Sequence, residues 1–194
     1  VSASDAPDLS DVTEMQNMFE QTTSFNSDIN HWDVSNITNM NQMFAGTVLF
    51  NQDLNNWNVE NVNNFSSMFR NCTAFNGDIS NWNPINGMNF TSIFENATSF
   101  NRDLYWDMSN ASSMDRMFEN ARIFNGDISS WSFTNAYSME GMFAGAEAFN
   151  GDISTWNVGN VRSMMSMFRD AKAFSGNLSS WNVGNVEDMD DMFF

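Results

Sequence analysis

Two patterns of hydrophobic residues alternate along this chain. In the stretch "ISSWSF", residues 128–133, Trp131 and Phe133 point one way with polar residues around them, and such alternation predicts a short strand. A second pattern has steps of three and four residues, which predicts a short helix with one buried face. It is clearest over residues 37–47, at Ile37, Met40, Met43, Phe44 and Thr47.

Both patterns recur with a fixed period. The Phe that opens each copy of "FNGDISNWN" or a close variant lies 25 residues after the last, with one step of 24, at Phe25, Phe50, Phe75, Phe100, Phe124, Phe149 and Phe174. A Trp follows each, at Trp32, Trp57, Trp82, Trp106, Trp131, Trp156 and Trp181. Such a period is typical of repeats that bury their apolar faces only against their neighbours.

We therefore predict one α/β solenoid domain over residues 9–194, preceded by an N-terminal extension at residues 1–8. It has about seven turns of strand and helix, with a parallel sheet on one face and the Trp row buried inside. Gly or Asn stands near the end of several predicted helices, as in "FAG", "FEN" and "FRN", which favours a left-handed residue at the helix exit.

The units "MFENATSFNRDLYWDMSNASSM" and "MFAGAEAFNGDISTWNVGNVRSM" resemble the repeat of BspA-type leucine-rich-repeat bacterial surface proteins. The similarity runs from about Leu9 to Phe194. The resemblance implies a right-handed leucine-rich-repeat-like solenoid on a secreted or cell-surface protein, with a role in adhesion or recognition. It implies no catalytic residues.

The net charge of the chain argues against some classes of binding partner. Asp and Glu number 24 against 7 Lys and Arg, a net charge of −17. Nucleic-acid binding needs basic surfaces, and anionic membranes repel an acidic protein, so neither is expected as a partner. No apolar run approaches the ~18 residues of a membrane span, so membrane insertion is not expected.

Two polar rows follow the repeat. The first is Asp28, Asp53, Asp78, Asp103, Asp127, Asp152 and then Asn177. Its side chains are expected to accept N–H bonds within tight turns, and the alternative is a ladder of Ca²⁺ ions between neighbouring carboxylates. The second row is expected to be buried and to bond to adjacent turns. It comprises Asn36, Asn61, Asn86, Asn110, Asn135, Asn160 and Asn185.

Few residues offer chemistry. His31 is the only histidine, which excludes a His-based metal cluster, and it is expected on the surface. Cys72 occupies a position that is Thr or Ala in other units, so it is expected to be a buried packing residue. "NIT" at Asn36 and "NAS" at Asn110 are glycosylation sequons, but a buried row could not be modified. We predict no enzyme, no cofactor and no metal.

Two surfaces remain as candidates for binding. One is the outward row after each Trp, at Asp33, Asn58, Asn83, Asp107, Ser132, Asn157 and Asn182. The other is an end interface at Met189, Met192, Phe193 and Phe194, where a helix face would lack a neighbour. The sequence thus favours an extracellular or cell-surface module for recognition or adhesion that contacts a protein partner. The alternative is a structural building block that self-associates end to end.

Overall fold

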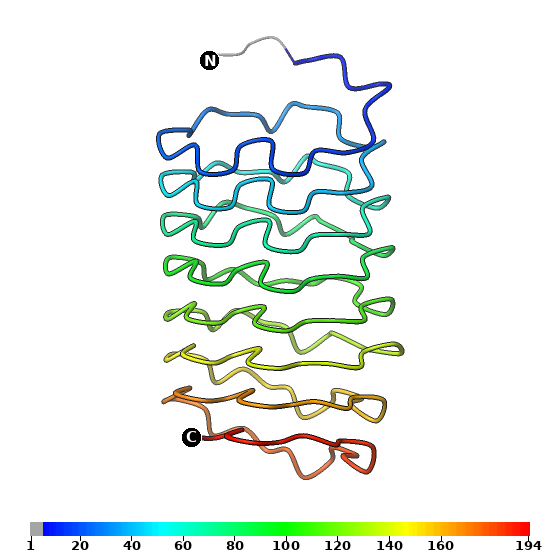
Figure 1. Ribbon diagram of the computed structural model, residues 1–194, viewed down its shortest axis with the longest axis vertical. Coiled ribbons are helices and arrows are strands. Elements are labelled where there is room, and N and C mark those ends of the chain that lie inside the picture. Colours follow the sequence, from blue (N-terminus) through cyan, green and yellow to red (C-terminus); the bar gives the residue numbers. More distant parts are fainter. Residues whose placement is uncertain (1–5) are drawn as a thin grey trace.

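A computed structural model describes residues 6–194, and it shows coils stacked along one long axis, with the first and the last described coils at opposite ends (Figure 1). Consecutive coils are joined by isolated parallel bridges, which link Glu14, Asn39, Asn64, Asn89, Ser113, Ser138, Ser163 and Asp188 in that order. Within residues 6–194 there is no helix and no strand longer than these single bridges. The predicted α/β leucine-rich-repeat-like solenoid with a parallel sheet is therefore wrong.

The predicted helix is replaced by what we call the ladder limb, residues 39–47 and their equivalents in the other coils. The N–H groups of Met40, Gln42, Phe44 and Gly46 donate to carbonyls of the next coil over 2.7 to 2.9 Å. The N–H groups at positions 43, 45 and 47 donate instead to the carbonyl three residues earlier. An α-helix requires donation to the carbonyl four residues earlier, and none of these groups makes that bond.

This limb keeps the helical spacing of apolar residues although it is not a helix. Successive turns closed by bonds three residues back also return the chain to the same side, so Met40, Met43, Phe44 and Thr47 are all buried. Burial was thus predicted correctly, but the backbone conformation was not.

In the ladder limb, bonds to the next coil alternate with bonds to the carbonyl three residues earlier. Residues with positive φ at two positions explain this alternation. A turn with a left-handed third residue closes a bond three residues back, and both positions show φ between 54° and 72°. The first position holds Asn17, Gln42, Ser67, Ser92, Arg116, Gly141, Ser166 and Asp191. The second holds Gln21, Gly46, Asn71, Asn96, Asn120, Gly145 and Asp170. The left-handed exit expected at "FAG", "FEN" and "FRN" is confirmed at this second position.

The rest of each coil, residues 50–62 and equivalents, we call the side-chain limb, because side chains make most of its bonds between coils. The predicted strand here is wrong, since no run of backbone bonds joins neighbouring coils. The predicted alternation is confirmed for burial in most coils: Trp57 and Val59 are buried and Asn58 between them is exposed. The last coil departs from it, because Val183 is exposed.

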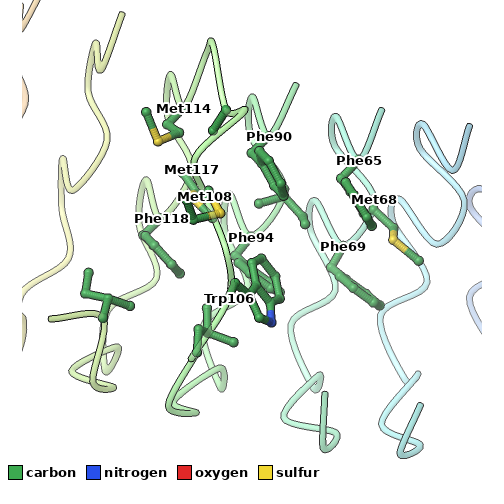
Figure 2. Packing of buried hydrophobic residues seen from close by; sticks show 14 of the residues in the cluster. Phe65, Met68, Phe69, Phe90, Phe94, Trp106, Met108, Met114, Met117 and Phe118 are labelled. Carbon is green, nitrogen blue, oxygen red and sulfur yellow. The ribbon is translucent and has the colours of Figure 1, made fainter. Parts of the chain in front are cut away.

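Aromatic side chains fill the space between the two limbs. The Trp row is buried as predicted, with exposed fractions from 2% to 9%. Equivalent rings stack from coil to coil, for example Phe69 on Phe94 with centroids 5.7 Å apart and Phe94 on Phe118 at 5.5 Å. Figure 2 shows these rings beside Phe65, Phe90 and Trp106 in the interior. Parallel rings at this spacing gain contact in every coil.

No helix within residues 6–194 is long and apolar enough to cross a membrane. Of the predicted N-terminal extension, residues 1–5 lie outside the part that the structure describes.

Candidate binding surfaces

The outward row predicted from the sequence lies on one side of the stack, and all seven of its side chains are exposed. Five of them are fixed by their own turn, because a side-chain oxygen accepts the N–H two residues later over 2.9 to 3.1 Å. These five are Asp33, Asn58, Asp107, Asn157 and Asn182. Bonds of this kind hold polar groups in place at a regular spacing without burying them.

The negative charge of Asp33, at the start of this row, is stabilised by its neighbour Ser35. Hydrogen bonds from the Ser35 side chain and backbone hold the pKa of Asp33 below its ordinary value. Between the second and third Trp-bearing coils the row borders a hollow of about 240 Å³. The hollow is lined by Asn56, Trp57, Asn58, Val59, Glu60, Asn81 and Asn83. Its rim is rich in amides, which can donate and accept hydrogen bonds.

The Asp row behaves mainly as turn residues. Asp28, Asp78, Asp127, Asp152 and Asn177 each accept the N–H two residues later, over 2.9 to 3.0 Å, so the predicted turn role is confirmed at these positions. Asp53 and Asp103 differ, because each accepts the backbone N–H of the equivalent Asp one coil later over 2.8 Å. No group of three or more His, Cys, Asp or Glu side chains gathers within residues 6–194.

The Asn36 row bonds as predicted but its burial was predicted wrongly. Six of its seven amides donate to a carbonyl of the preceding coil over 2.7 to 3.1 Å. At Asn135 the neighbouring Thr134 hydroxyl donates instead, to the Ser109 carbonyl. All seven side chains are exposed. A single hydrogen bond from the amide to the preceding coil, made at the surface, does not require the side chain to be buried. Burial therefore does not protect the sequons at Asn36 and Asn110.

A third amide row was missed from the sequence. The Asn after each opening Phe accepts the backbone N–H of the equivalent residue one coil later, over 2.7 to 3.0 Å. The acceptors are Asn26, Asn51, Asn76, Asn101, Asn125 and Asn150. The recurring "FN" pair in the sequence could have revealed this row, because the Asn follows the opening Phe in almost every unit.

The glycine that follows in "FNGD" allows close approach of the coils. A Cβ at Gly77 would lie 2.1 Å from the Gln52 carbonyl oxygen, and one at Gly126 would lie 2.0 Å from that of Arg102. This explains why the stretch is repeated: its Asn bonds to the next coil, its Gly lets the coils approach, and its Asp mostly fixes the turn of its own coil.

His31 and Cys72, the two residues considered as reactive groups, occupy different environments. His31 is exposed and Cys72 is fully buried, as predicted. Burial raises the pKa of the Cys72 thiol to about 12, and its Sγ donates to the Phe44 carbonyl. A thiol with this pKa is a poor nucleophile.

The C-terminal edge has three of its four predicted residues exposed. Met189, Phe193 and Phe194 expose 42%, 63% and 75% of their surfaces, whereas Met192 is buried. Phe193 stacks on Phe168 with centroids 5.6 Å apart. A hollow of about 300 Å³ beside them is lined by Phe168, Asp170, Ala171, Lys172, Phe174, Phe193 and Phe194.

These features define a repeat protein built from one coil unit, with a regular polar row on its surface. The chain belongs to the DUF285 family, described as a Mycoplasma protein of unknown function, whose family model matches residues 2–106 and again 92–194. The two tandem matches agree with the internal repeat. They do not show whether the chain is one of the BspA-type proteins that its units resemble. A comparison with curated proteins finds no match.

Proposed function

We propose that this protein is a non-enzymatic recognition or adhesion module at the cell surface or outside the cell. It binds a protein partner along the outward row after the Trp residues. The observation that carries the proposal is the fixed geometry of this row, in which five of seven exposed side chains are held by their own turns.

Fixed polar groups favour binding because less conformational freedom is lost when the partner arrives. The row repeats once per coil, which suits a partner that is itself extended and offers hydrogen-bonding groups at several points. Its formal charges are Asp33 and Asp107, beside a net charge of −17, so electrostatic steering favours basic partners.

The resemblance of the repeat units to BspA-type bacterial surface proteins supports the same setting. We infer from that resemblance, together with the absence of an activated nucleophile among the residues considered, that the molecule acts by contact alone.

The test keeps the turns and changes only the outward groups. In the triple variant Asn58→Asp, Asn157→Asp, Asn182→Asp each position keeps an oxygen that can accept the N–H two residues later, but loses its outward amide donor. The control adds three carboxylates to exposed positions of another row, as Ser24→Asp, Ala148→Asp, Ala173→Asp.

Beads coated with each protein are counted on epithelial cell monolayers and on fibronectin-coated plates. We expect the parent and the control to adhere to at least one of the two, and the face variant to lose most of that adhesion. Equal adhesion of all three would show that the row is not the binding surface, and no adhesion of the parent to either probe would contradict the adhesion role.

A further inference from the structure

Exposed Asn side chains surround the hollow beside the outward row, between the second and third Trp-bearing coils. Asn58 is held by its own turn, because its Oδ1 accepts the Glu60 N–H over 3.1 Å. The side chains of Asn56, Asn81 and Asn83 make no hydrogen bond to any other residue of the described chain. Each of these three amides therefore offers an N–H₂ donor and a carbonyl oxygen to a ligand.

Later coils do not repeat this arrangement. Thr155 stands at the position equivalent to Asn56, and its hydroxyl donates to the Ser129 carbonyl of the preceding coil over 3.3 Å. Ser180, one coil further, donates to the Ser154 carbonyl in the same way. Asn occupies this position only in the two coils that form the hollow, so the stacking of coils does not require these free amides.

Glu60 is the one charged residue among the described residues that line the hollow, and its backbone is fixed on both sides. Its N–H donates to Asn58, and its carbonyl accepts the Asn86 amide over 2.8 Å. Its carboxylate is exposed and forms no ion pair within residues 6–194. The equivalent residue is neutral in the neighbouring coils, at Ser35 and Ile85, so the hollow has a carboxylate that its neighbours lack.

These groups favour a cation with several N–H donors. A guanidinium group is planar, carries N–H donors along its edges, has no acceptor and stays charged. The Glu60 carboxylate can accept a parallel pair of these bonds, and the amide oxygens around the hollow can accept others. An ammonium group concentrates its donors at one point and reaches fewer acceptors. An anion would meet the Glu60 charge with no Lys or Arg to offset it among the described lining residues.

We propose that this hollow binds an arginine side chain of the protein partner, an inference that rests on the adhesion role proposed above and names the group that anchors the partner. The guanidinium pairs with the Glu60 carboxylate and donates to the amide oxygens of Asn56, Asn81 and Asn83. The N–H₂ groups of the same amides remain free to donate to backbone carbonyls on either side of the arginine.

An NMR titration of the isotope-labelled chain tests the proposal with three short peptides, Ac-Gly-X-Gly-NH₂, in which X is arginine, lysine or citrulline. Citrulline has nearly the shape of arginine but no charge. We expect the arginine peptide to shift the side-chain amide signals of Asn56, Asn81 and Asn83 saturably, with a dissociation constant of about 1 mM. The lysine and citrulline peptides bind about fivefold more weakly, since an ion pair open to solvent contributes little more than this.

Two variants remove the acceptors of the hollow and leave its backbone bonds in place. Glu60→Gln is expected to weaken binding of the arginine peptide by about fivefold. The double variant Asn56→Ser, Asn81→Thr introduces residue types that later coils carry at this position, and it also weakens binding. The control Glu14→Gln removes the same charge from an exposed carboxylate of the ladder limb and binds like the parent.

The absence of a saturable shift at about 10 mM arginine peptide, or equal binding of all three peptides, overturns the proposal. A folded Glu60→Gln variant that binds the arginine peptide like the parent overturns it as well. Beads that adhere although the arginine peptide does not bind would leave the row as the binding surface and remove only the anchor. Arginine binding by a parent that does not adhere would contradict the adhesion role and support the guanidinium site alone.

Discussion

The indole N–H of Trp131 donates to the carbonyl of Leu104, 27 residues earlier, over 2.7 Å. Four other tryptophans make the same bond to the preceding coil, namely Trp57, Trp82, Trp156 and Trp181. Trp106 is equally buried, yet its Nε1 has no partner among the described residues. Its unit is one residue short, so Trp106 lies only two residues after Leu104 and the turn that precedes the other tryptophans is lost.

The first prediction compares these two tryptophans. Trp131→Phe removes a hydrogen bond and leaves the Leu104 carbonyl unpaired, whereas Trp106→Phe removes an N–H that has no partner. We expect Trp131→Phe to lower the free energy of unfolding by about 1 kcal/mol more than Trp106→Phe does. Urea denaturation measures both variants, and equal costs would show that the bond to Leu104 contributes nothing net.

The second prediction concerns Glu119. Burial, with a further contribution from the Glu95 carboxylate, raises the pKa of Glu119 above its ordinary value of 4.5, while Arg116 acts in the opposite sense. A raised pKa in the folded state means that ionisation opposes folding, so the penalty is present at neutral pH and disappears as pH falls below the unfolded value.

Glu119→Gln is therefore expected to raise the melting temperature at pH 7 and to have less effect at pH 4. Glu60→Gln, at an exposed carboxylate of the same charge, is the control. Calorimetry at the two pH values measures the difference. A Glu119→Gln effect that is absent at pH 7, or larger at pH 4, would mean that the Arg116 ion pair outweighs burial.

The third prediction is that calcium has little effect on stability. The oxygens of Asp78 and Asp127 already accept N–H bonds of their own turns, and Asp53 and Asp103 serve the next coil. A specific site at about 100 times its dissociation constant adds about 2.7 kcal/mol, or roughly 5–11 °C in melting temperature. Melting curves with 1 mM calcium and with a chelator should agree within about 2 °C, and a shift in the larger range would support bridging ions.

Much of each coil could be predicted from the sequence because burial follows side-chain chemistry. The Trp row, Cys72, the polar row at Asn58 and its equivalents, and the left-handed residues at Gly46 and Asn71 were all found in this way. The conformation of residues 39–47 was not, because a helix and a series of three-residue turns bury the same positions. Bonds between coils decide between the two, and a pattern within one unit does not contain them.

For the binding surfaces, too, the sequence predicted which side chains are exposed but not how the backbone is hydrogen-bonded. The outward row could be placed because alternation marks its residues as exposed, whereas the bonds that fix five of them within their own turns were not predicted for this row. The direction of the bonds between coils depends on the backbone, and no side-chain pattern reveals it.

The central claim is that the ladder limb is a series of turns with left-handed residues and not a helix, and Arg116 tests it most directly. Arg116 has φ of 55° and an exposed side chain, so replacing it removes the same weak ion pair to Glu119 whichever residue is introduced. A left-handed residue with a Cβ costs roughly 1–2 kcal/mol, which glycine avoids. In a helix, alanine is instead more stable than glycine by about 1 kcal/mol.

The measurement is the free energy of unfolding of Arg116→Gly against Arg116→Ala, by urea denaturation under identical conditions. Glycine also loses more freedom on folding, by about 0.5–1 kcal/mol, which reduces its net advantage. The account predicts that the Gly variant is the more stable of the two by about 0.5–1 kcal/mol. An Ala variant more stable than the Gly variant by about 1 kcal/mol would contradict it.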